Sequence, residues 1–335
     1  MALDLPVIWA LIIAFAVLMY VLMDGFDLGV GILFPLAHRD EDRDLMMNSV
    51  APIWDGNETW LVLGGGGLLA AFPLAYSIIM PALYFPVLTM LIALIFRGVA
   101  FEFRFKASPH RRWIWDRAFN IGSIVATFSQ GLVLGGFLQG FRVEERDFVG
   151  GPFDWLSPFG LFVGVALVCG YALLGATWLI MKTEGALQER FYALARPLTL
   201  GMAGFIVVVS VWTPLYYPLI ADRWFSWPNL LYLSPIPLVT AAAVLGLLAA
   251  LRRRAEVLPF LLALALFLLG FLGLAVSLWP YVVPPDIVVW DAASEPNSLA
   301  FMLVGALILT PFILFYTGYT YFVFRGKVRT DTGYH

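Results

Sequence analysis

The stretch VLPFLLALALFLLGFLGLAVSLWP, residues 257–280, contains no charged side chain and closely follows the basic cluster Arg252–Arg254. A helix needs about 20 apolar residues to cross the hydrocarbon core of a bilayer, so this run is long enough to span it. The whole chain has the same character, with 61% hydrophobic and only 13% charged residues. Because soluble domains carry roughly twice that charged share, the sequence predicts an integral membrane protein. Its net charge of -3 gives no sign of a nucleic-acid partner.

Eight further apolar runs are separated by polar connections. Together with the first run they predict an all-α fold of about nine transmembrane helices, in a single polytopic membrane domain covering residues 1–335. We also expect a tight turn after Pro73, between the second and third spans. The predicted spans are 7–36, 51–74, 78–101, 118–140, 157–181, 197–220, 229–251, 257–280 and 299–324.

The basic residues predict which ends of the spans face the cytoplasm. Of the 20 Lys and Arg residues, Arg97 lies inside a span and only Arg142, Arg146 and Arg223 fall in connections on one side. The other 16 therefore lie on the opposite side. Cytoplasmic connections carry an excess of Lys and Arg, so we expect an external amino terminus and a cytoplasmic carboxyl terminus. An even number of spans would break this alternation.

Four carboxylates lie within the first two predicted spans, where ionisable groups are costly and tend to mark ion or proton routes. Asp24 and Asp27 are three residues apart, as are Asp55 and Glu58, so each pair faces one side of its helix. The helical rise places Asp55 roughly 6 Å from the inner end of its span, and Arg97 at the same level in the third span. We therefore expect Arg97 to be the charge partner in a network with Asp55 and Glu58.

Two interpretations of these carboxylates remain open. With water between them, they could pass protons inward from the cytoplasm. Paired by Arg97 and Asn57, they could instead form a buried polar network that fixes helix register. Asp24 could also serve only to begin a helix distortion with Gly25. Gln130 in the fourth span is expected to hydrogen-bond another helix.

The chain lacks the residues of several cofactor sites. Its three histidines, His38, His110 and His335, all fall outside the predicted spans. Because a membrane haem usually takes at least one histidine ligand, we expect this chain to ligate no haem and to hold no metal. The run Gly64–Gly67 lacks the Lys-Ser/Thr of a phosphate-binding loop and instead allows close helix packing or a local break in the helix.

Three motifs resemble those of one known family. They are MDGFDLGVG at residues 23–31, NSVAPIWDGNETWL at 48–61 and FRGVAFEFR at 96–104. A further likeness runs from Trp279-Pro280 to Trp290-Asp291-Ala292. On these motifs the chain is similar, over its whole length, to subunit II of cytochrome bd-type quinol oxidases. Its short external connection before the seventh span resembles the shorter, cyanide-insensitive form.

The resemblance implies a heterodimer in the bacterial cytoplasmic (inner) membrane. Each subunit of that family has nine helices, arranged as two four-helix bundles plus one peripheral helix, and a small accessory single-span subunit can accompany them. Subunit I carries two b-type and d-type haems and the quinol-oxidising loop, whereas subunit II ligates no haem. The complex oxidises quinol near the outer face and reduces oxygen to water with cytoplasmic protons, so it is electrogenic without pumping.

The resemblance also implies roles for individual residues. The Asp of the Trp-Asp-Gly-Asn motif, here Asp55, lies on a proton path towards the haems of subunit I. The second Trp of that motif, here Trp60, lies near the point where oxygen is proposed to enter. Members of the family have Gln or Glu at the position of Glu58. A structural quinone can lie in subunit II, although no motif of this sequence indicates where. We expect the proton path to comprise Asp55, Glu58, Asp27 and Asp24.

Two other functions remain as alternatives. A proton-coupled secondary transporter would need charges reachable from both faces, whereas these carboxylates occupy only the inner half of the first two spans. A pure assembly scaffold for subunit I would tolerate neutralisation of Asp55. The absorption spectrum of the purified complex separates the classes, because a co-purifying d-type haem band identifies the quinol oxidase.

Overall fold

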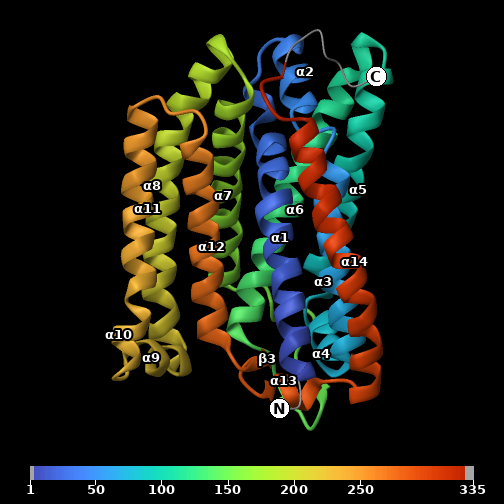
Figure 1. The fold of residues 1–335 in the computed structure, drawn as a ribbon, viewed down its shortest axis with the longest axis vertical. Helices are drawn as coiled ribbons and strands as arrows, with labels where there is room; N and C mark the ends of the chain where they lie inside the picture. Colours follow the sequence, from blue (N-terminus) through green and yellow to red (C-terminus); the bar gives the residue numbers. More distant parts are fainter. Residues whose placement is uncertain (1–3, 329–335) are drawn as a thin grey trace.

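The computed structural model describes residues 4–328, and its helices run almost parallel to one long axis (Figure 1). The end of the chain that is predicted to be cytoplasmic, with Arg329 and His335, lies outside the described residues. The first half of the chain supplies one bundle, in which α1 contacts both α3 and α6 and α5 packs along α6. Its helices are α1 (Leu5–Leu33), α3 (Trp54–Ala71), α5 (Tyr84–Lys106) and α6 (Arg112–Gln139).

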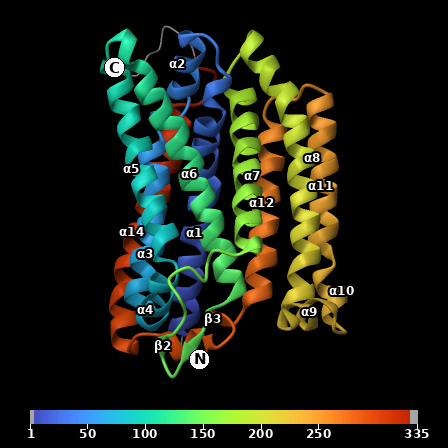
Figure 2. The same cartoon turned by 180° about the vertical axis from the view of Figure 1, so that it is seen from behind.

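A second bundle packs beside the first through α7, which contacts both α1 and α6 (Figure 2). The last helix, α14 (Pro296–Val323), lies outside both bundles and packs mainly on α1 and α3. This arrangement agrees with the expected pair of four-helix bundles plus one peripheral helix. The helices of the second bundle are α7 (Pro158–Lys182), α8 (Gly185–Tyr216), α11 (Pro235–Arg252) and α12 (Leu258–Leu278).

Short elements close the two ends of the bundles. One end holds η1 (Phe34–Leu36), α2 (Asp40–Asn48) and η2 (Pro109–Arg111). At the other end, two short antiparallel hairpins pair Val143 with Phe148 and, with an irregular register, Tyr281 with Val288 (Figure 2). That end comprises α4 (Pro73–Ala82), β1 (Val143–Glu144), β2 (Asp147–Phe148), α9 (Pro218–Phe225), α10 (Asn229–Leu233), β3 (Tyr281–Val283), β4 (Ile287–Val288) and α13 (Val289–Ala292).

Eight helices within residues 4–328 are long and apolar enough to cross a membrane. The helix α3 occupies the second predicted span, 51–74, but it is less apolar because it carries three polar residues of the Asp55–Glu58 segment and the Gly64–Gly67 run. The expected turn after Pro73 is wrong: Pro73 begins α4, since proline is well accommodated at the first position of a helix. The third predicted span, 78–101, divides between α4 and α5 at Leu83.

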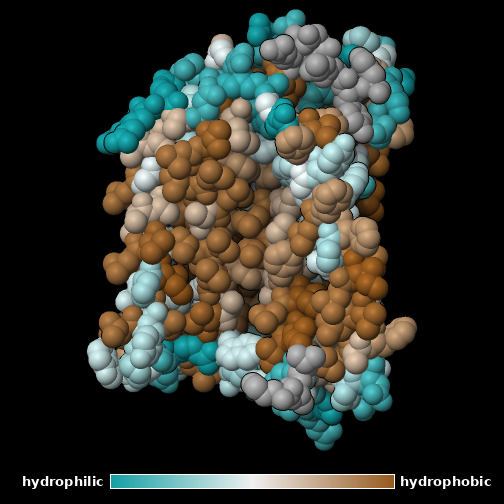
Figure 3. Space-filling model, viewed as in Figure 1, coloured by the Kyte–Doolittle hydropathy of each residue, from teal (hydrophilic) through white to brown (hydrophobic). Residues whose placement is uncertain are grey.

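The surface matches a chain that lies in a bilayer. On the face shown in Figure 3, a broad apolar belt crosses the middle of the molecule, and polar side chains gather at both ends. Many large apolar side chains of the chain are strongly exposed, such as Phe301 at 82% and Leu215 at 74%. Such extensive apolar exposure is untenable in water and expected in lipid.

The two bundles meet through backbone contact between α6 and α7. A Cβ atom on Gly131 would lie 2.5 Å from the Cα of Gly164, and one on Gly135 would lie 2.5 Å from the Cα of Gly160. Only glycine allows helices to approach this closely. Gly131 and Gly135 therefore form a contact surface between the two helices.

Candidate functional site

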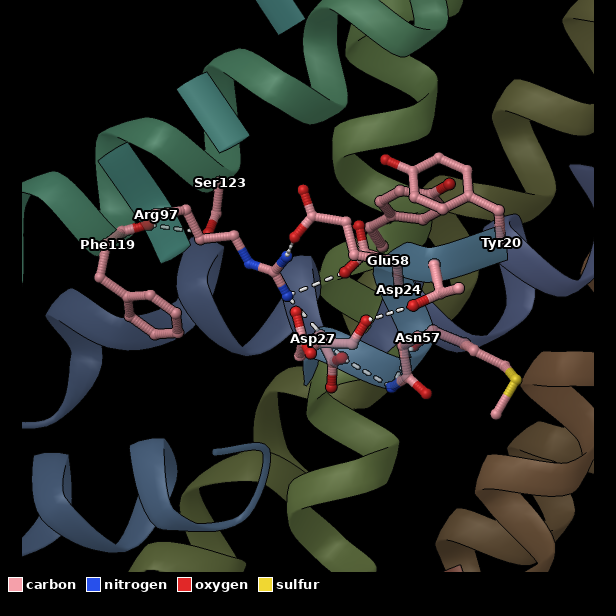
Figure 4. Close-up of polar contacts among 12 residues, drawn as sticks. Tyr20, Asp24, Asp27, Asn57, Glu58, Arg97, Phe119 and Ser123 are labelled. Atoms are coloured by element: carbon pink, nitrogen blue, oxygen red, sulfur yellow. Dashed lines mark hydrogen bonds and ion pairs between the residues drawn. The ribbon is translucent and has the colours of Figure 1, made fainter. Parts of the chain in front are cut away.

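Arg97 lies at the centre of a buried polar cluster between α1, α3 and α5 (Figure 4). Its Nη2 atom is 2.8 Å from Asp24 Oδ1 and 3.7 Å from Asp27 Oδ2, and its Nη1 atom is 3.5 Å from Glu58 Oε2. The Arg97, Asp24 and Asp27 side chains are fully buried, and the Glu58 side chain is 25% exposed. The cluster therefore brings three carboxylates to one guanidinium at membrane depth.

The local sequence explains how these groups meet. Asp24 and Asp27 are three residues apart on α1, so both carboxylates project from one face of the helix. On the far side of α5, a Cβ atom on Gly122 of α6 would lie 2.8 Å from a backbone oxygen of α5 and 3.2 Å from Arg97 N. The glycine lets α6 pack against the α5 backbone at this level, while the guanidinium reaches the other way, towards α1 and α3.

Asn57 connects the cluster to the peripheral helix. Its Nδ2 atom donates to Asp27 Oδ2 at 2.7 Å and to the carbonyl oxygen of Met23 at 3.4 Å. Its Oδ1 atom accepts a hydrogen bond from the Tyr321 hydroxyl of α14 at 2.9 Å. Asn57 was predicted from the sequence as a partner of the carboxylates, and its contact with Asp27 agrees with that prediction. Tyr321 was not predicted, because aromatic residues are common in membrane spans for unrelated reasons.

Asp55 does not join this cluster. The expected network of Arg97, Asp55 and Glu58 is therefore wrong for Asp55, although Glu58 does pair with Arg97. Asp55 lies exposed in the first turn of α3, and it makes no ion pair within the described part of the chain. The predicted depths of Asp55 and Arg97 were wrong because the ends of their helices differ from the predicted span ends. The helix α3 begins at Trp54, three residues later than expected, and α5 extends to Lys106. Arg97 is therefore roughly 14 Å from the end of its helix, well beyond the level of Asp55.

Asp24 makes the shortest of the three Arg97 ion pairs. The proposal that Asp24 with Gly25 only begins a helix distortion is wrong, because α1 continues as a regular helix through both residues. Gly25 instead allows close packing, since a Cβ atom there would lie 2.9 Å from the ring of Tyr171 on α7. Asp24 is therefore a full member of the cluster.

A second hydrogen-bonded line runs beside the cluster. Gln130 Nε2 donates to the Tyr20 hydroxyl oxygen at 2.7 Å, and the Tyr171 hydroxyl donates to Gln130 Oε1 at 2.9 Å. These bonds link α6 to α1 and α7, so the prediction that Gln130 bonds another helix is confirmed. Tyr20 lies one turn from Asp24 on α1, which brings the line next to the carboxylates (Figure 4). No pattern in the sequence marks either tyrosine as part of this network.

Trp60 is buried where α3 meets α1. Its side chain is 1% exposed and packs edge-to-face on Phe15, with ring centroids 5.7 Å apart. It belongs to a small apolar cluster with Ala16 and Tyr20. Its surroundings are thus apolar, although the helix turn before it carries Glu58.

A separate ionic cluster lies near the α2 end of the bundle. Arg104 of α5 is fully buried and pairs with Asp44 of α2 and with Asp116 of α6, the latter at 2.5 Å. Arg43 of α2 pairs with Asp116 as well, at 3.3 Å. Arg104 was predicted to lie in the connection that follows the third span, 78–101. Its contacts show that it ties three helices together. Within residues 4–328, no group of His, Cys, Asp and Glu is arranged to hold a metal ion.

Comparisons with known proteins agree on one family. The family described as "Cytochrome bd terminal oxidase subunit II" matches residues 5–324. "Cytochrome bd-I ubiquinol oxidase subunit 2" of Escherichia coli is 32% identical, over 97% of this chain and 95% of that protein. "Cytochrome bd ubiquinol oxidase subunit 2" of Bacillus subtilis is 28% identical, over 96% of each chain.

A solved structure has the same fold. The bd oxidase from Geobacillus thermodenitrificans contains a chain that superimposes with a TM-score of 0.75 at 20% identity, covering 97% of this chain and 100% of that one. At that identity the likeness concerns the fold alone, whereas the family match and the Escherichia coli relative extend over nearly the whole sequence. The chain therefore belongs to the family of subunit II of cytochrome bd terminal oxidases.

Proposed function

We propose that this chain supports a haem-bearing subunit I in a terminal quinol oxidase and supplies part of the path for cytoplasmic protons. Quinol gives up electrons and protons, and reduction of oxygen to water consumes protons that must reach a buried haem. The observation that carries the proposal is the Arg97 cluster, in which three carboxylates lie within 4 Å of one buried guanidinium.

The charges of this cluster favour a role in proton transfer. One guanidinium neutralises only one of the three carboxylates, and uncompensated charge at membrane depth is costly. A cluster of Asp24, Asp27 and Glu58 with Arg97 is therefore most stable when it holds a proton as well. Groups that share a proton and differ little in energy can pass it on, which a purely structural ion pair does not require.

The proposed order of the proton path runs from the most exposed carboxylate to the most buried ones. Asp55 lies exposed in the first turn of α3, and Glu58 lies one turn further along the same helix, with its side chain 25% exposed. Asp24 and Asp27 are fully buried beyond it. Asp55 then takes up a proton, Glu58 receives it, and the two buried carboxylates pass it towards subunit I.

The exposed face of α3 is the proposed contact with subunit I. It carries Asp55, Thr59, Val62 and Gly65, all of which are exposed in this chain. A carboxylate facing lipid is costly, and a Cβ atom on Gly65 would meet nothing within 4 Å, so this face is suited to a closely packed partner helix. Coverage by subunit I would also give the protons a protein route onward.

The haems are assigned to subunit I because the histidines within residues 4–328 do not fit them. His38 lies between η1 and α2, and His110 lies in η2, so neither is at membrane depth. A d-type or b-type haem in the membrane would need such a ligand. Trp60 is proposed to lie near the point where oxygen enters, since its surroundings are apolar. A structural quinone and a small accessory single-span subunit remain part of the proposal from the family resemblance.

The orientation is proposed from charge. The end of the molecule that carries α2 and η2 also carries most of the Lys and Arg residues, and the hairpin end carries few. By the positive-inside rule, the α2 end faces the cytoplasm and the amino terminus faces outward. The chain is then a multi-pass protein of the bacterial inner membrane, with Asp55 near the cytoplasmic face.

The Asp55→Asn variant of the complete complex tests the proposed path. It keeps the shape of the side chain but cannot exchange a proton, and general acid–base groups contribute about 10²-fold or more, so quinol-driven oxygen consumption should fall at least tenfold. The haem spectrum and subunit assembly should stay normal. Glu102→Gln is a matched control, because Glu102 is an exposed carboxylate that pairs with Lys106 at 3.0 Å outside the cluster.

The alternatives predict other results. If the chain were a pure assembly scaffold, the Asp55→Asn complex would turn over normally, or it would assemble poorly without a separate loss of turnover. If the chain were a proton-coupled transporter, it would transport its substrate without any haem-bearing partner. Near-normal oxygen consumption in an assembled Asp55→Asn complex would remove Asp55 from the mechanism.

A further inference from the structure

Tyr321 is where the peripheral helix α14 reaches the buried cluster. Its hydroxyl donates to Asn57 Oδ1 at 2.9 Å, and its ring centroid lies 6.4 Å from those of both Phe26 and Trp178. Little else of α14 is buried: Leu299 and Thr317 are the only residues of this helix that are classed as buried, at 1% and 9% exposure. An otherwise exposed helix thus directs one hydroxyl into the bundle, onto a residue that contacts the carboxylates.

The contacts of Asn57 define how its amide points. An amide group accepts through its oxygen and donates through its nitrogen. With Oδ1 accepting from Tyr321, Nδ2 faces Asp27 Oδ2 at 2.7 Å and the carbonyl oxygen of Met23 at 3.4 Å. The reverse orientation would set Oδ1 against two other acceptor oxygens. Donation from Nδ2 favours the ionised form of Asp27, so the amide orientation and the charge of Asp27 are linked.

A short segment after α14 holds Tyr321 in place. We call residues 324–328 the carboxyl-terminal strap. The Lys182 Nζ atom donates to the carbonyl oxygens of Phe324 and Gly326 at 2.7 and 3.2 Å, and Val328 N donates to the Lys182 carbonyl oxygen at 2.8 Å. Lys327 adds an ion pair with Glu256 at 2.8 Å. The strap therefore fixes the end of α14 to the second bundle within one turn of Tyr321.

We propose that Tyr321 is a positioning residue for proton transfer, which acts through Asn57 to hold the Asp27 carboxylate ready to exchange its proton. The inference rests on the proposed proton path and extends it to the peripheral helix. Tyr321 does not itself carry the proton in this scheme. It fixes the direction of one hydrogen bond, and the strap and the ring contacts keep it there.

Several other groups face Asp27 and stay unchanged in the test. They share burial in the same region and come from the neighbouring helices. The charged ones are Asp24 on α1, Glu58 on α3 and Arg97 on α5. Tyr20 on α1 and Tyr171 on α7 lie further along, where both bond to Gln130.

The test compares Tyr321→Phe with Tyr319→Phe in the complete complex. Tyr321→Phe removes one hydroxyl and keeps the ring, whereas Tyr319 is exposed on the same helix and its ring only stacks on Phe315. One lost hydrogen bond, of about 1 kcal/mol, corresponds to a decrease in turnover on the order of fivefold. The pH profile should shift as well, because the hydrogen bond that positions the Asp27 carboxylate through Asn57 is lost.

A double-variant cycle shows whether Tyr321 acts through Asn57. In the Asn57→Leu background, Tyr321→Phe should add no further loss, since its hydrogen-bond partner is already gone. The infrared carbonyl band that disappears in Asp27→Asn should change its intensity in Tyr321→Phe and not in Tyr319→Phe. If Tyr321 had only a structural role, Tyr321→Phe would lower the stability of the complex without changing the pH profile of turnover or the infrared band.

The outcomes separate the inference from the proposed path. If Asp27→Asn lowers turnover while Tyr321→Phe matches Tyr319→Phe in rate, pH profile and infrared band, the positioning role is overturned and the path stands. If Asp27→Asn leaves turnover unchanged in an assembled complex, the path itself fails. Additive losses in the double variant would mean that Tyr321 acts by another route.

Discussion

At the scale of single residues, Arg97 determines whether the buried carboxylates can coexist. Its guanidinium forms ion pairs with Asp24, Asp27 and Glu58, each within 4 Å, and no other cation joins them among the described residues. Low-dielectric surroundings strengthen these attractions but also raise the cost of any carboxylate left without a partner. The position of each acidic side chain in the cluster therefore depends on this one residue.

We predict that Arg97→Gln strongly destabilises the complex. Removing one partner of a buried ion pair typically costs about 3–5 kcal/mol, because the remaining charges stay buried. Thermal unfolding of the purified complex, followed by loss of haem absorbance, measures the effect. Arg142→Gln is the control, since its pair with Asp154 at 2.8 Å is exposed and such pairs contribute about 0–1 kcal/mol. Equal stability of the two variants would mean that the ion pairs of Arg97 do not stabilise the complex.

Spacing along the sequence was enough to identify most members of this cluster. The three-residue interval of Asp24 with Asp27 correctly predicted a shared helix face, since both carboxylates reach Arg97. The same interval did not bring Asp55 to the face of Glu58, because Asp55 is exposed while Glu58 pairs with Arg97. Depth could not be predicted as well, because helix ends are set by turns and tertiary contacts, and an error of five residues moves a group by roughly 7 Å. Asp55 was misplaced relative to Arg97 for this reason.

At the scale of elements, the carboxyl-terminal strap joins α14 to the second bundle. Glu256 accepts hydrogen bonds from Lys327 at 2.8 Å and from Gln188 at 3.0 Å. These bonds lower the pKa of the Glu256 carboxyl below its ordinary value, and the bond from Lys327 has the larger effect. Because Glu256 lies outside the helices, between α11 and α12, it can exchange protons freely with solvent.

We predict that acid loosens the strap. A group whose pKa is lower in the folded state contributes stability above its unfolded pKa, and loses that contribution as the pH falls through its folded pKa. A spin label on Arg325→Cys, in a Cys169→Ser background, should become more mobile below the ordinary titration range of a glutamate. Glu256→Gln should show that mobility already at neutral pH. If Glu256→Gln stays as immobile as its parent, the bonds to Lys182 alone hold the strap.

The elements themselves were predicted unevenly. Long apolar runs such as 257–280 correspond closely to single helices, here α12, because composition alone decides them. The segment 72–83 was not predictable, since α3 carries polar and glycine residues and α4 is too short to show a membrane-spanning pattern. The link from Tyr321 to Asn57 joins residues 264 positions apart, and no local pattern in the sequence encodes it.

At the scale of the whole molecule, the chain leaves one polar face without a partner. The second bundle exposes mainly apolar side chains such as Leu215 and Leu245, which suit lipid. The face of α3 instead exposes Asp55, Thr59 and Gly65 within the same belt of helices. A carboxylate in contact with lipid is costly, so this side is where we propose that subunit I packs.

We predict that Gly65→Leu prevents assembly with subunit I while the chain itself still folds. The chain leaves room for a side chain there, because a Cβ atom on Gly65 would meet nothing within 4 Å, but a leucine would keep a closely packed partner helix at a distance. Co-purification of the two subunits and the helical circular dichroism of this chain measure both effects. Gly270→Leu on α12 is the matched control, being equally open and on the other bundle. Normal assembly of Gly65→Leu would move the interface elsewhere.

The orientation of the whole molecule gives the proton path its direction, and it can be tested directly. Single cysteines at Glu144 in the β1–β2 hairpin and at Ser108 before η2 lie at opposite ends of the bundle, and both positions are exposed. In a Cys169→Ser background, we expect a membrane-impermeant thiol reagent applied to intact cells to label Glu144→Cys. Ser108→Cys should label only after the membrane is opened, because the basic end stays in the cytoplasm. Labelling in the reverse pattern would place Asp55 at the outer face. The carboxylates would then draw protons from the wrong side, and the proposed function would fail together with the orientation.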